Sequence, residues 1–424
     1  MKYRDSSALC YYGGRRKTVG KAFLILTHRL SIAAQPKKQE AGSAMGYLGK
    51  DINKLGFGLM RLPRKEGTKA SGVFGGGEID SAQTAQMVDA FLEAGLTYFD
   101  TARGYEGSEA VIRTTLVDRY PRESFQLATK LPAWAGPKNA AEARQMFETS
   151  LETTNAGYFD FYLLHNLGAK RTQVFNDFEM WEYVVDLKRQ GLVKHIGFSL
   201  HDSAAALDEL LRAHPEMEFV LLQINYAYWL DGSVQSKACY EVARRHGKPV
   251  IIMEPVRGGA LANPPQPVWD VLREANPNAS PVQWALRFCL GLENIITVLS
   301  GMSSLEQMKQ NIAIYQNFKP LTDAEMRVIE KAQQALAAIP TVPCTACKYC
   351  LKQCPQNIEI DNIMQALNRG TLYGLADGKS CYWFATMLSP KASTCIQCGA
   401  CEDACPQGIA LIKELKRAAK TFEG

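Results

Sequence analysis

Short apolar runs recur along the first 340 positions, and each is followed by a stretch with helical periodicity. Apolar runs bounded by turn residues predict buried strands, whereas apolar residues spaced three and four apart predict amphipathic helices. The predicted strands are 55–60 (LGFGLM), 97–102 (TYFDTA), 125–130 (FQLATK), 159–165 (FDFYLLH), 195–200 (HIGFSL), 219–226 (FVLLQINY), 249–255 (PVIIMEP) and 296–302 (ITVLSGM). Eight apolar strands alternating with helices predict parallel pairing with the helices outside.

Helices are predicted at 81–95 and 176–191, each closed by a glycine, and at 322–339, which opens with Thr and carries Glu three residues later. The last pattern is a capping box. Eight strand–helix units favour a (β/α)8 TIM barrel over a doubly wound sheet. The doubly wound alternative lacks its G-x-G-x-x-G fingerprint, since the glycine-rich 74–80 does not follow a strand.

The chain has 424 residues, of which 46% are hydrophobic and 21% charged. That length accommodates one barrel and a small second module. Proline residues at 340–343 (PTVP) break the chain, so we place a barrel at 45–340 and a smaller domain at 341–424. We find no apolar run long enough to span a bilayer and therefore expect no membrane association.

The net charge of +5 comes from the N-terminal segment 1–44, which holds nine Lys and Arg against two acids. The rest of the chain sums to about −2, so nothing predicts a nucleic-acid partner. We interpret 1–44 as a disordered basic extension or a start-site over-call. An export leader is the alternative, but its apolar stretch is interrupted by His28 and Arg29. We expect the protein to be cytoplasmic.

Three neighbouring predicted strands end in titratable residues, Asp100, Lys130 and His165, and Tyr105 lies in the loop just after the first of them. Chemistry in such barrels gathers at the carboxyl ends of the strands, so these side chains are expected to converge. Tyr is a weak acid at neutral pH, but a Lys ammonium held by an Asp would lower its pKa. With His orienting a carbonyl, the set suits proton delivery during hydride reduction. Each residue alone would more often be structural.

The motifs YFDTARGYEGSE, LATK, YLLHN and GFSLH resemble the aldo/keto reductase family over about residues 47–318. The family's Asp, Tyr, Lys and His tetrad would correspond to Asp100, Tyr105, Lys130 and His165. The resemblance implies an enzyme that interconverts a small carbonyl and alcohol substrate with NADPH or NADH, bound without a Rossmann fold.

The resemblance also implies coenzyme contacts. Ser199 and Gln223 would hold the nicotinamide carboxamide. The adenosine phosphate would meet the start of the helix after the eighth strand, through the candidates Ser303, Gln307 and Asn311. A helix start is a plausible phosphate seat, because amide groups and the helix dipole point there. Two positions depart from the family pattern: Met253 stands where many members stack an aromatic on nicotinamide, and Leu200 where many have Asn. No Arg or Lys precedes Lys309 in the adenosine segment, so the choice between NADP and NAD stays open.

Two runs, 344–356 and 395–407, share C-x2-C-x2-C-x3-C-P spacing and hold eight of the twelve cysteines. The spacing is typical of bacterial ferredoxins with two [4Fe-4S] clusters, in which the fourth Cys of each run ligates the other cluster. This predicts one cluster on Cys344, Cys347, Cys350 and Cys405, and another on Cys395, Cys398, Cys401 and Cys354. Two zinc sites are the alternative.

The remaining cysteines are isolated, and we interpret Cys239, Cys289 and Cys381 as buried thiols, with Cys381 as an alternative stray ligand. The aromatic residues of 373–388, between the two runs, are expected to pack the small domain onto the barrel. Barrel and tail together resemble a subgroup of aldo/keto reductases with a ferredoxin-like C-terminal domain.

A hydride carries two electrons, whereas each cluster accepts one, and the sequence holds no flavin fingerprint. We therefore predict an NAD(P)H-dependent oxidoreductase with two accessory clusters. One alternative is a ferredoxin-coupled redox enzyme that exchanges electrons with a flavoprotein or ferredoxin partner. Another is a redox-responsive regulatory protein built on a retired barrel.

Overall fold

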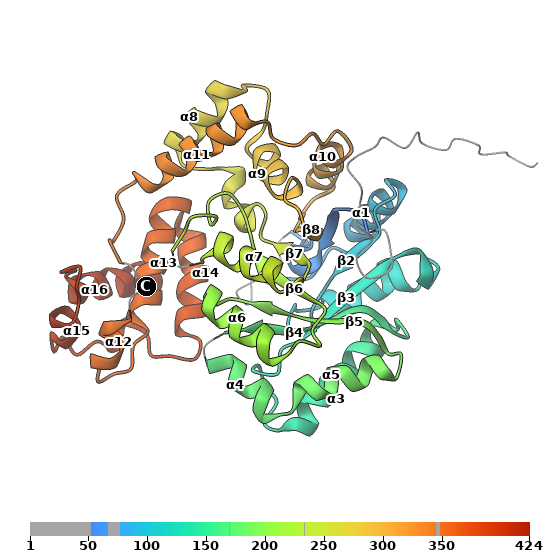
Figure 1. Ribbon diagram of the computed structural model, residues 1–424, viewed down its shortest axis with the longest axis horizontal. Helices are drawn as coiled ribbons and strands as arrows, with labels where there is room; N and C mark the ends of the chain where they lie inside the picture. Colours follow the sequence, from blue (N-terminus) through green and yellow to red (C-terminus); the bar gives the residue numbers. More distant parts are fainter. Residues whose placement is uncertain (1–51, 67–76, 169, 233, 345–347) are drawn as a thin grey trace, which may run out of the picture. The chain divides into compact units, whose positions relative to one another are not determined.

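Eight parallel strands close into a barrel in the computed structural model, which describes residues 52–66, 77–168, 170–232, 234–344 and 348–424 (Figure 1). The expectations for 1–44 and Cys347 lie outside these residues. The strands are β1 (Leu55–Gly58), β2 (Tyr98–Asp100), β3 (Gln126–Leu131), β4 (Phe159–Leu167), β5 (Val193–Leu200), β6 (Phe219–Gln223), β7 (Val250–Met253) and β8 (Ile295–Ser300). All eight predicted strands and their parallel order are confirmed.

Each strand pairs with the next along the chain, and β1 closes the ring against β8. Strands β2, β3 and β8 are buried along their whole length, as the near-continuous apolar runs predict. One apolar cluster is formed by residues of the strands: Tyr98, Ala128, Phe161, Leu163, Phe219, Leu221, Ile251, Ile296 and Leu299. A larger cluster packs the other strand faces against the helices. The barrel is therefore a packed core.

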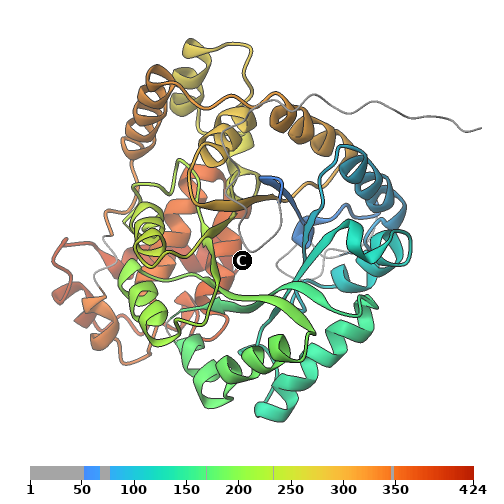
Figure 2. The ribbon, with the colours of Figure 1, turned by 45° about the vertical axis from the view of Figure 1, so that its right-hand side comes forward.

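The helices of this part lie around the outside of the strands in both ribbon views (Figures 1 and 2). They are α1 (Ser81–Glu93), α2 (Ser108–Ile112), α3 (Ala140–Thr154), α4 (Lys170–Asp177), α5 (Met180–Arg189), α6 (Ala204–Ala213), α7 (Ser236–Arg245), α8 (Gln266–Ala275), α9 (Pro281–Leu290), α10 (Leu305–Gln316) and α11 (Asp323–Ala337). Short 3-10 or π segments are η2 (Leu59–Arg61), η3 (Arg113–Val117), η4 (Arg122–Ser124) and η5 (Arg257–Ala262).

One predicted helix is wrong in its extent. The pattern over 176–191 divides between α4 and α5, because Glu179 adopts a left-handed backbone with φ 56° that no continuous helix contains. The side chain of Trp181 bridges the break by donating to Asn176 Oδ1 at 2.8 Å. Periodicity alone did not detect the break, since the apolar spacing continues across it.

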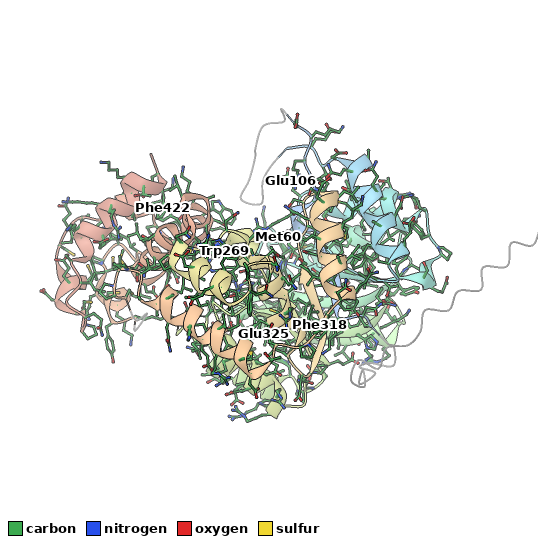
Figure 3. All side chains as sticks on the ribbon, turned by 90° about the horizontal axis from the view of Figure 1, so that it is seen from above. Met60, Glu106, Trp269, Phe318, Glu325 and Phe422 are labelled. Atoms are coloured by element: carbon green, nitrogen blue, oxygen red, sulfur yellow. The ribbon has the colours of Figure 1, made fainter. Side chains whose placement is uncertain are left out.

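The helices after β8 begin where the capping residues predict. The Ser304 hydroxyl accepts from the backbone of Gln307 at the start of α10. At the start of α11, Thr322 and Glu325 form the expected capping box. Glu325, labelled in Figure 3, also pairs with Arg287 of α9 at 2.6 Å, which ties α11 to the barrel wall.

The C-terminal part is helical and has an apolar cluster of its own. Its elements are α12 (Tyr349–Gln353), α13 (Ile360–Tyr373), α14 (Leu375–Thr386), η6 (Ala392–Thr394), α15 (Ala400–Asp403) and α16 (Leu411–Phe422). The cluster combines apolar residues of α13 and α16 with cysteines of both runs, and Phe422 of α16 packs beside it (Figure 3). Barrel and terminal helices belong to one compact unit.

The expectation that the aromatics of 373–388 fasten this part to the barrel holds for one residue and is wrong for others. The Tyr373 ring lies 3.3 Å from the Arg257 guanidinium carbon and packs against the barrel core. In contrast, Tyr382 stacks on Phe422 inside the terminal part. Trp383 is 40% exposed. A turn of helix α14 points its consecutive aromatics in different directions, which the composition could not reveal.

The two isolated barrel cysteines are buried as expected. Burial raises the pKa of the Cys239 thiol to about 12 and places that of Cys289 higher still. Cys381 is partly buried, and burial raises its pKa also. None of the described helices has the length and apolar character needed to cross a membrane.

Candidate active site

Three strand ends and one loop bring the four predicted residues together. Asp100 ends β2, Lys130 lies near the end of β3, and His165 lies in β4. Tyr105 lies in the loop before α2. The Lys130 ammonium donates to Asp100 Oδ1 at 2.5 Å, to the Thr101 carbonyl at 2.7 Å and to the Tyr105 hydroxyl at 3.3 Å. Lys130 therefore connects the carboxylate to the phenol.

The charge on Lys130 is held by its neighbours. Burial disfavours the ammonium, but Asp100 and Tyr105 more than offset it and raise the pKa of Lys130 above its usual value. Burial also raises the pKa of Asp100, and Lys130 opposes that shift. Both side chains are almost fully buried. Removing either one would therefore leave the other as an uncompensated buried charge.

Tyr105 behaves differently from the expectation. Lys130 does act to lower its pKa, but burial is the larger effect and raises the pKa above the usual value. Tyr105 is therefore a neutral phenol across the physiological range, with a hydroxyl that can give up a proton. The side chain is partly exposed, so a substrate can reach it.

His165 faces Tyr105 edge to face, with ring centroids 5.7 Å apart. Burial lowers the pKa of His165 well below its usual value, and the positive charge of Lys130 adds to the shift. The imidazole is thus neutral at pH 7. Its Nδ1 atom is buried and has no hydrogen-bond partner among the described residues. A neutral imidazole in this position can hold a substrate oxygen near the Tyr105 hydroxyl.

A buried polar network sets the loop that carries Tyr105. The carboxylate of Glu109 accepts from Thr129 at 2.8 Å and from Arg103 at 3.2 Å. The Ser108 hydroxyl lies 2.7 Å from that of Thr101 and donates to a carbonyl after β1. These bonds connect the loop to β2 and β3, so the position of Tyr105 is fixed by the strands.

The two residues expected at the nicotinamide end lie on adjacent strands. Ser199 of β5 is buried, and its hydroxyl accepts from the Asn166 backbone at 2.7 Å. Gln223 ends β6 and donates to Glu254 Oε1 at 3.1 Å. Glu254 follows β7 with φ 57°, and burial raises the pKa of its carboxyl. The structure thus brings Gln223 to the mouth with a partner that already orients its amide.

The candidates at the adenosine end are more dispersed. Ser303 donates to the Arg61 carbonyl at 2.7 Å, and its backbone N–H donates to the Gln307 side chain at 2.8 Å. Asn311 is 4% exposed and donates to Ser300 at 2.7 Å, so it lies beneath the surface. The Arg61 guanidinium lies against Gly258, where an added Cβ would approach it to 2.8 Å.

Cysteines of the two runs lie close to one another. Cys344 and Cys350 of the first run line a small cavity together with Cys405 of the second run. Cys347, expected in the same set, lies outside the described residues. The other lining residues are Ile360, Ile409 and Leu411 and the polar Lys348, Asp361 and Gln407. Three thiols around one small cavity fit a [4Fe-4S] cluster, whose remaining ligand would come from Cys347.

The second set is indicated by the surroundings of Cys401. Burial raises the pKa of its thiol to about 11, and the nearby Cys395 and Cys354 add to the shift. These three belong to the predicted second set, in which Cys354 comes from the first run. Cys398, the fourth member, is exposed. Within the described ranges, no three metal-ligating side chains meet closely enough for a single ion.

The family of the protein follows from comparison with known proteins. The Aldo/keto reductase family matches residues 54–334, which is most of the chain. The chain belongs to the aldo/keto reductase family. A 4Fe-4S dicluster domain matches residues 343–410, so this aldo/keto reductase carries a two-cluster iron–sulfur domain after its barrel.

Curated relatives match the barrel. An aldo-keto reductase of Mycolicibacterium vanbaalenii is 28% identical over 242 residues, covering 57% of this chain and 81% of that protein. The 9,11-endoperoxide prostaglandin H2 reductase of Trypanosoma cruzi is 26% identical over 261 residues, covering 60% and 84%. Both matches cover most of the relative, so the likeness extends over nearly whole reductases.

Solved structures show the same fold. An aldo-keto reductase of Bacillus halodurans in its holo form has a TM-score of 0.52 at 24% identity, covering 67% of this chain and 93% of that one. An aldo-keto reductase of Klebsiella pneumoniae in complex with NADPH has a TM-score of 0.52 at 19% identity, covering 66% and 90%. At such identities the likeness concerns the fold.

Sequence reasoning missed two residues of this aldo/keto reductase. Glu254 follows directly after Met253 at the end of β7, so the rule that finds polar residues at strand ends would have included it. Arg61 gave no such signal. It follows β1, far in sequence from the segment at 303–311, and only the closed barrel brings it beside Ser303.

Proposed function

We propose that the protein is an NAD(P)H-dependent oxidoreductase that interconverts a small carbonyl and its alcohol through Asp100, Tyr105, Lys130 and His165. The observation that carries this proposal is the Lys130 ammonium, which contacts both the Asp100 carboxylate and the Tyr105 hydroxyl. A charged group beside a phenol stabilises the phenolate that forms when the proton leaves.

In the proposed reduction, the carbonyl oxygen lies between the Tyr105 hydroxyl and the His165 ring. Bound NAD(P)H would supply a hydride to the carbonyl carbon. As negative charge develops on the substrate oxygen, Tyr105 transfers its proton there, and the resulting phenolate is stabilised by Lys130. Tyr105 then regains a proton from solvent. The alcohol gains one hydride and one proton, and the reverse sequence oxidises it.

Coenzyme binding is supported by residues at two places, one for the nicotinamide and one for the adenosine phosphate. Ser199 and Gln223 would hold the carboxamide, with Glu254 keeping the Gln223 amide in orientation. At the other end, Ser303 precedes α10, Gln307 lies in its first turn, and Asn311 lies beneath the surface. Arg61 supplies the cation that the segment itself lacks, and Arg-phosphate contacts are strong. NADPH and NADH both fit this description.

The test is the rate of NAD(P)H oxidation by anaerobically purified protein with a panel of aldehydes and ketones. We expect Tyr105→Phe to reduce kcat by about 10²- to 10⁴-fold, because the proton donor is lost. Tyr120→Phe, which removes a hydroxyl bonded to Asp89 on the outer helices, is the matched control and should leave kcat unchanged. Equal activity of the Tyr105→Phe protein would refute the proposal.

A ferredoxin-coupled role is the second candidate, and the exposure near the second cluster set favours it. Cys398 is exposed, and the neighbouring Ile396 is 59% exposed. An apolar side chain beside a cluster edge suits transient docking of a flavoprotein or ferredoxin. In this reading Ile396→Asp slows cluster reduction by an added ferredoxin or flavoprotein reductase, whereas carbonyl reduction is unaffected. Equal reduction rates for the variant and the parent would remove this candidate.

We further propose that the barrel occupies 45–340 and the iron–sulfur domain 341–424, with the boundary at the prolines after α11. We also propose the cytoplasm as the compartment, because closely spaced thiols at metal-ligand positions need reducing conditions. Fractionation of the native cells with an antibody tests the compartment, and limited proteolysis with a first cut between α11 and α12 tests the boundary.

A further inference from the structure

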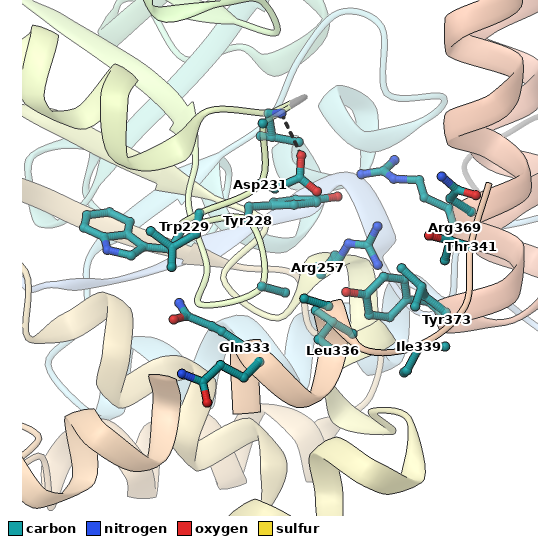
Figure 4. A pocket seen from close by; sticks show the side chains of 18 of the residues that line it. Tyr228, Trp229, Asp231, Arg257, Gln333, Leu336, Ile339, Thr341, Arg369 and Tyr373 are labelled. Carbon is teal, nitrogen blue, oxygen red and sulfur yellow. Dashed lines mark hydrogen bonds between the residues drawn. The ribbon is translucent and has the colours of Figure 1, made fainter. Parts of the chain in front are cut away.

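A cavity of about 1060 Å³ lies beside the loop after β6, helix α11 and helix α13, outside the tetrad (Figure 4). We call it the seam cavity and define it by Tyr228, Trp229, Arg257, Arg369 and Tyr373, with Cys344 at its border. Its volume is in the range of pockets that hold cofactor-sized ligands. No step of the proposed carbonyl reduction uses it.

The central cation of the seam cavity is incompletely satisfied. Arg257 is only 4% exposed, yet its Nε and Nη1 atoms have no hydrogen-bond partner among the described residues. Its Nη2 atom forms an ion pair with the Asp377 carboxylate at 3.7 Å, a distance too long for a hydrogen bond. A buried guanidinium with two unmatched donors has a large free-energy cost unless an anion accepts from it. The position therefore favours an anionic ligand.

The same guanidinium is surrounded by aromatic rings. Its central carbon lies 3.3 Å from the Tyr373 ring centroid and 4.8 Å from that of Tyr228, and Figure 4 shows it between the two. A second cation, Arg369, lies 5.4 Å from the Tyr228 ring. Trp229 lines the same space. Ring faces and planar cations together suit a flat aromatic molecule that carries a negative charge.

The seam cavity borders both the predicted cluster ligands and the side chains next to the barrel mouth. Cys344, one of the predicted cluster ligands, lines the cavity at one end. On the barrel side the Tyr228 hydroxyl donates to Glu254 Oε2 at 3.4 Å, and Glu254 also holds Gln223. A molecule in the seam cavity would thus lie next to a cluster and one side chain away from the barrel mouth.

We propose that the seam cavity binds a phosphorylated isoalloxazine or a similar flat, anionic two-electron carrier, for which flavin mononucleotide (FMN) is the probe. Such a carrier could link a two-electron hydride donor to clusters that each accept one electron, because it accepts two electrons and releases them singly. In the proposed step, FMNH2 gives one electron to each of two oxidised [4Fe-4S] clusters, which yields FMN, two protons and two reduced clusters. FMNH2 is the reductant, and no other co-reactant is needed.

The test is a fluorescence titration of FMN into the anaerobic, cluster-containing protein, with saturating NADP+ present to fill any coenzyme site. Stacking on the rings should quench FMN emission. We expect FMN to bind more tightly than riboflavin, which lacks the phosphate. Arg257→Gln should weaken FMN binding about tenfold or more and riboflavin binding much less, because riboflavin lacks the phosphate. Arg244→Gln, which alters an exposed arginine paired with Glu293, is the matched control and should change neither affinity.

A second variant keeps the test decisive if Arg257→Gln disturbs folding. Trp229→Leu removes a ring face without changing charge, so it should weaken FMN and riboflavin binding alike. Equal affinity of the parent protein for FMN and riboflavin, or no binding of either, would overturn the proposed site. The titration does not need Tyr105, so repeating it in the Tyr105→Phe protein separates this proposal from that of carbonyl reduction.

The electron step has its own measurement. Rapid mixing of limiting FMNH2 with oxidised protein should bleach the cluster absorbance, with two clusters reduced per FMNH2. The rate should fall in the Arg257→Gln and Trp229→Leu proteins in proportion to their lost affinity. Identical bleaching rates in parent and variant proteins would show that the cavity does not deliver electrons.

Discussion

The barrel mouth and the iron–sulfur domain bring together reactive side chains in opposite ways. In the barrel, the Lys130 ammonium donates to Asp100 at 2.5 Å and to the Thr101 carbonyl at 2.7 Å, so the protein's own atoms hold this charge in place. In the terminal domain, Cys344, Cys350 and Cys405 border one small cavity. The strands fix the barrel site, whereas the terminal site depends on the group it holds.

The two sites differ because different structures surround the barrel residues and the terminal cysteines. Eight strands paired in a closed barrel hold the candidate catalytic residues on a rigid scaffold. The terminal helices α12 and α15 are each shorter than two turns, and isolated helices of that length are marginal in water. We infer that the barrel is stable without its coenzyme, while the terminal domain gains much of its stability from its clusters.

The largest expected effect comes from breaking the barrel pair. Lys130→Met should reduce carbonyl turnover by about 10²-fold or more, because Tyr105 loses its stabilising charge. It should also lower the free energy of unfolding by about 3–5 kcal/mol, since Asp100 is left buried without its cation. Chemical denaturation and steady-state kinetics measure the two effects.

The double variant Lys130→Met/Asp100→Asn is the control for that experiment. Removing the unmatched carboxylate should restore most of the stability but none of the activity. If the double variant were as unstable as the single one, the buried-charge explanation would be wrong.

The next effect concerns the clusters. Cys350→Ser should reduce the iron content by about half and increase hydrogen exchange in α12–α16, with exchange in β1–β8 unchanged. Cys239→Ser, in a buried barrel thiol outside both runs, is the matched control and should keep the iron content of the parent. Increased exchange throughout the barrel in Cys350→Ser would contradict the independence of the two regions.

The pH dependence gives a smaller effect. Burial and positive neighbours lower the pKa of His165, and burial raises that of Tyr105, so neither should titrate between about pH 6.5 and 9. The kcat for carbonyl reduction should therefore be flat in that range. An inflection in kcat near the usual His pKa that disappears in His165→Gln would show that this imidazole is not held neutral.

The free energy of unfolding should decrease in acid because of His201. Burial lowers its folded-state pKa to about 4. Between about pH 6.5 and 4 the unfolded chain binds a proton that the folded chain does not, so stability is lost as the pH falls. We expect His201→Gln to reduce this loss by roughly 1–2 kcal/mol, measured by urea denaturation at pH 7 and pH 5.

The smallest effect distinguishes two neighbouring aromatics of α14. Tyr382→Phe removes a hydroxyl that accepts from Ala392 at 2.8 Å and binds Glu423, so it should cost about 1–2 kcal/mol of unfolding free energy. Trp383→Ser changes a side chain that is 40% exposed and should cost about 0.5 kcal/mol or less. Equal costs would mean that the two residues are packed alike.

Much of the fold was predictable because the signals are local or strictly ordered. Each apolar run marked a strand, and parallel barrels place the carboxyl end of every strand at one mouth, so Asp100, Lys130 and His165 could be grouped in advance. The capping box of α11 was readable from Thr322 and Glu325 alone. The break at Glu179 was not, because a backbone angle leaves no trace in apolar spacing.

The sequence by itself determined the order of the barrel strands, and it predicted the four candidate catalytic residues and the exchange of ligands between the two cysteine runs. Only the tertiary structure decided the pKa shift of Tyr105, since burial depends on neighbours from several strands. It alone placed Arg61 beside Ser303 and Arg257 between Tyr228 and Tyr373. Such contacts join residues far apart in the chain, and their energies depend on distances and burial that exist only after folding.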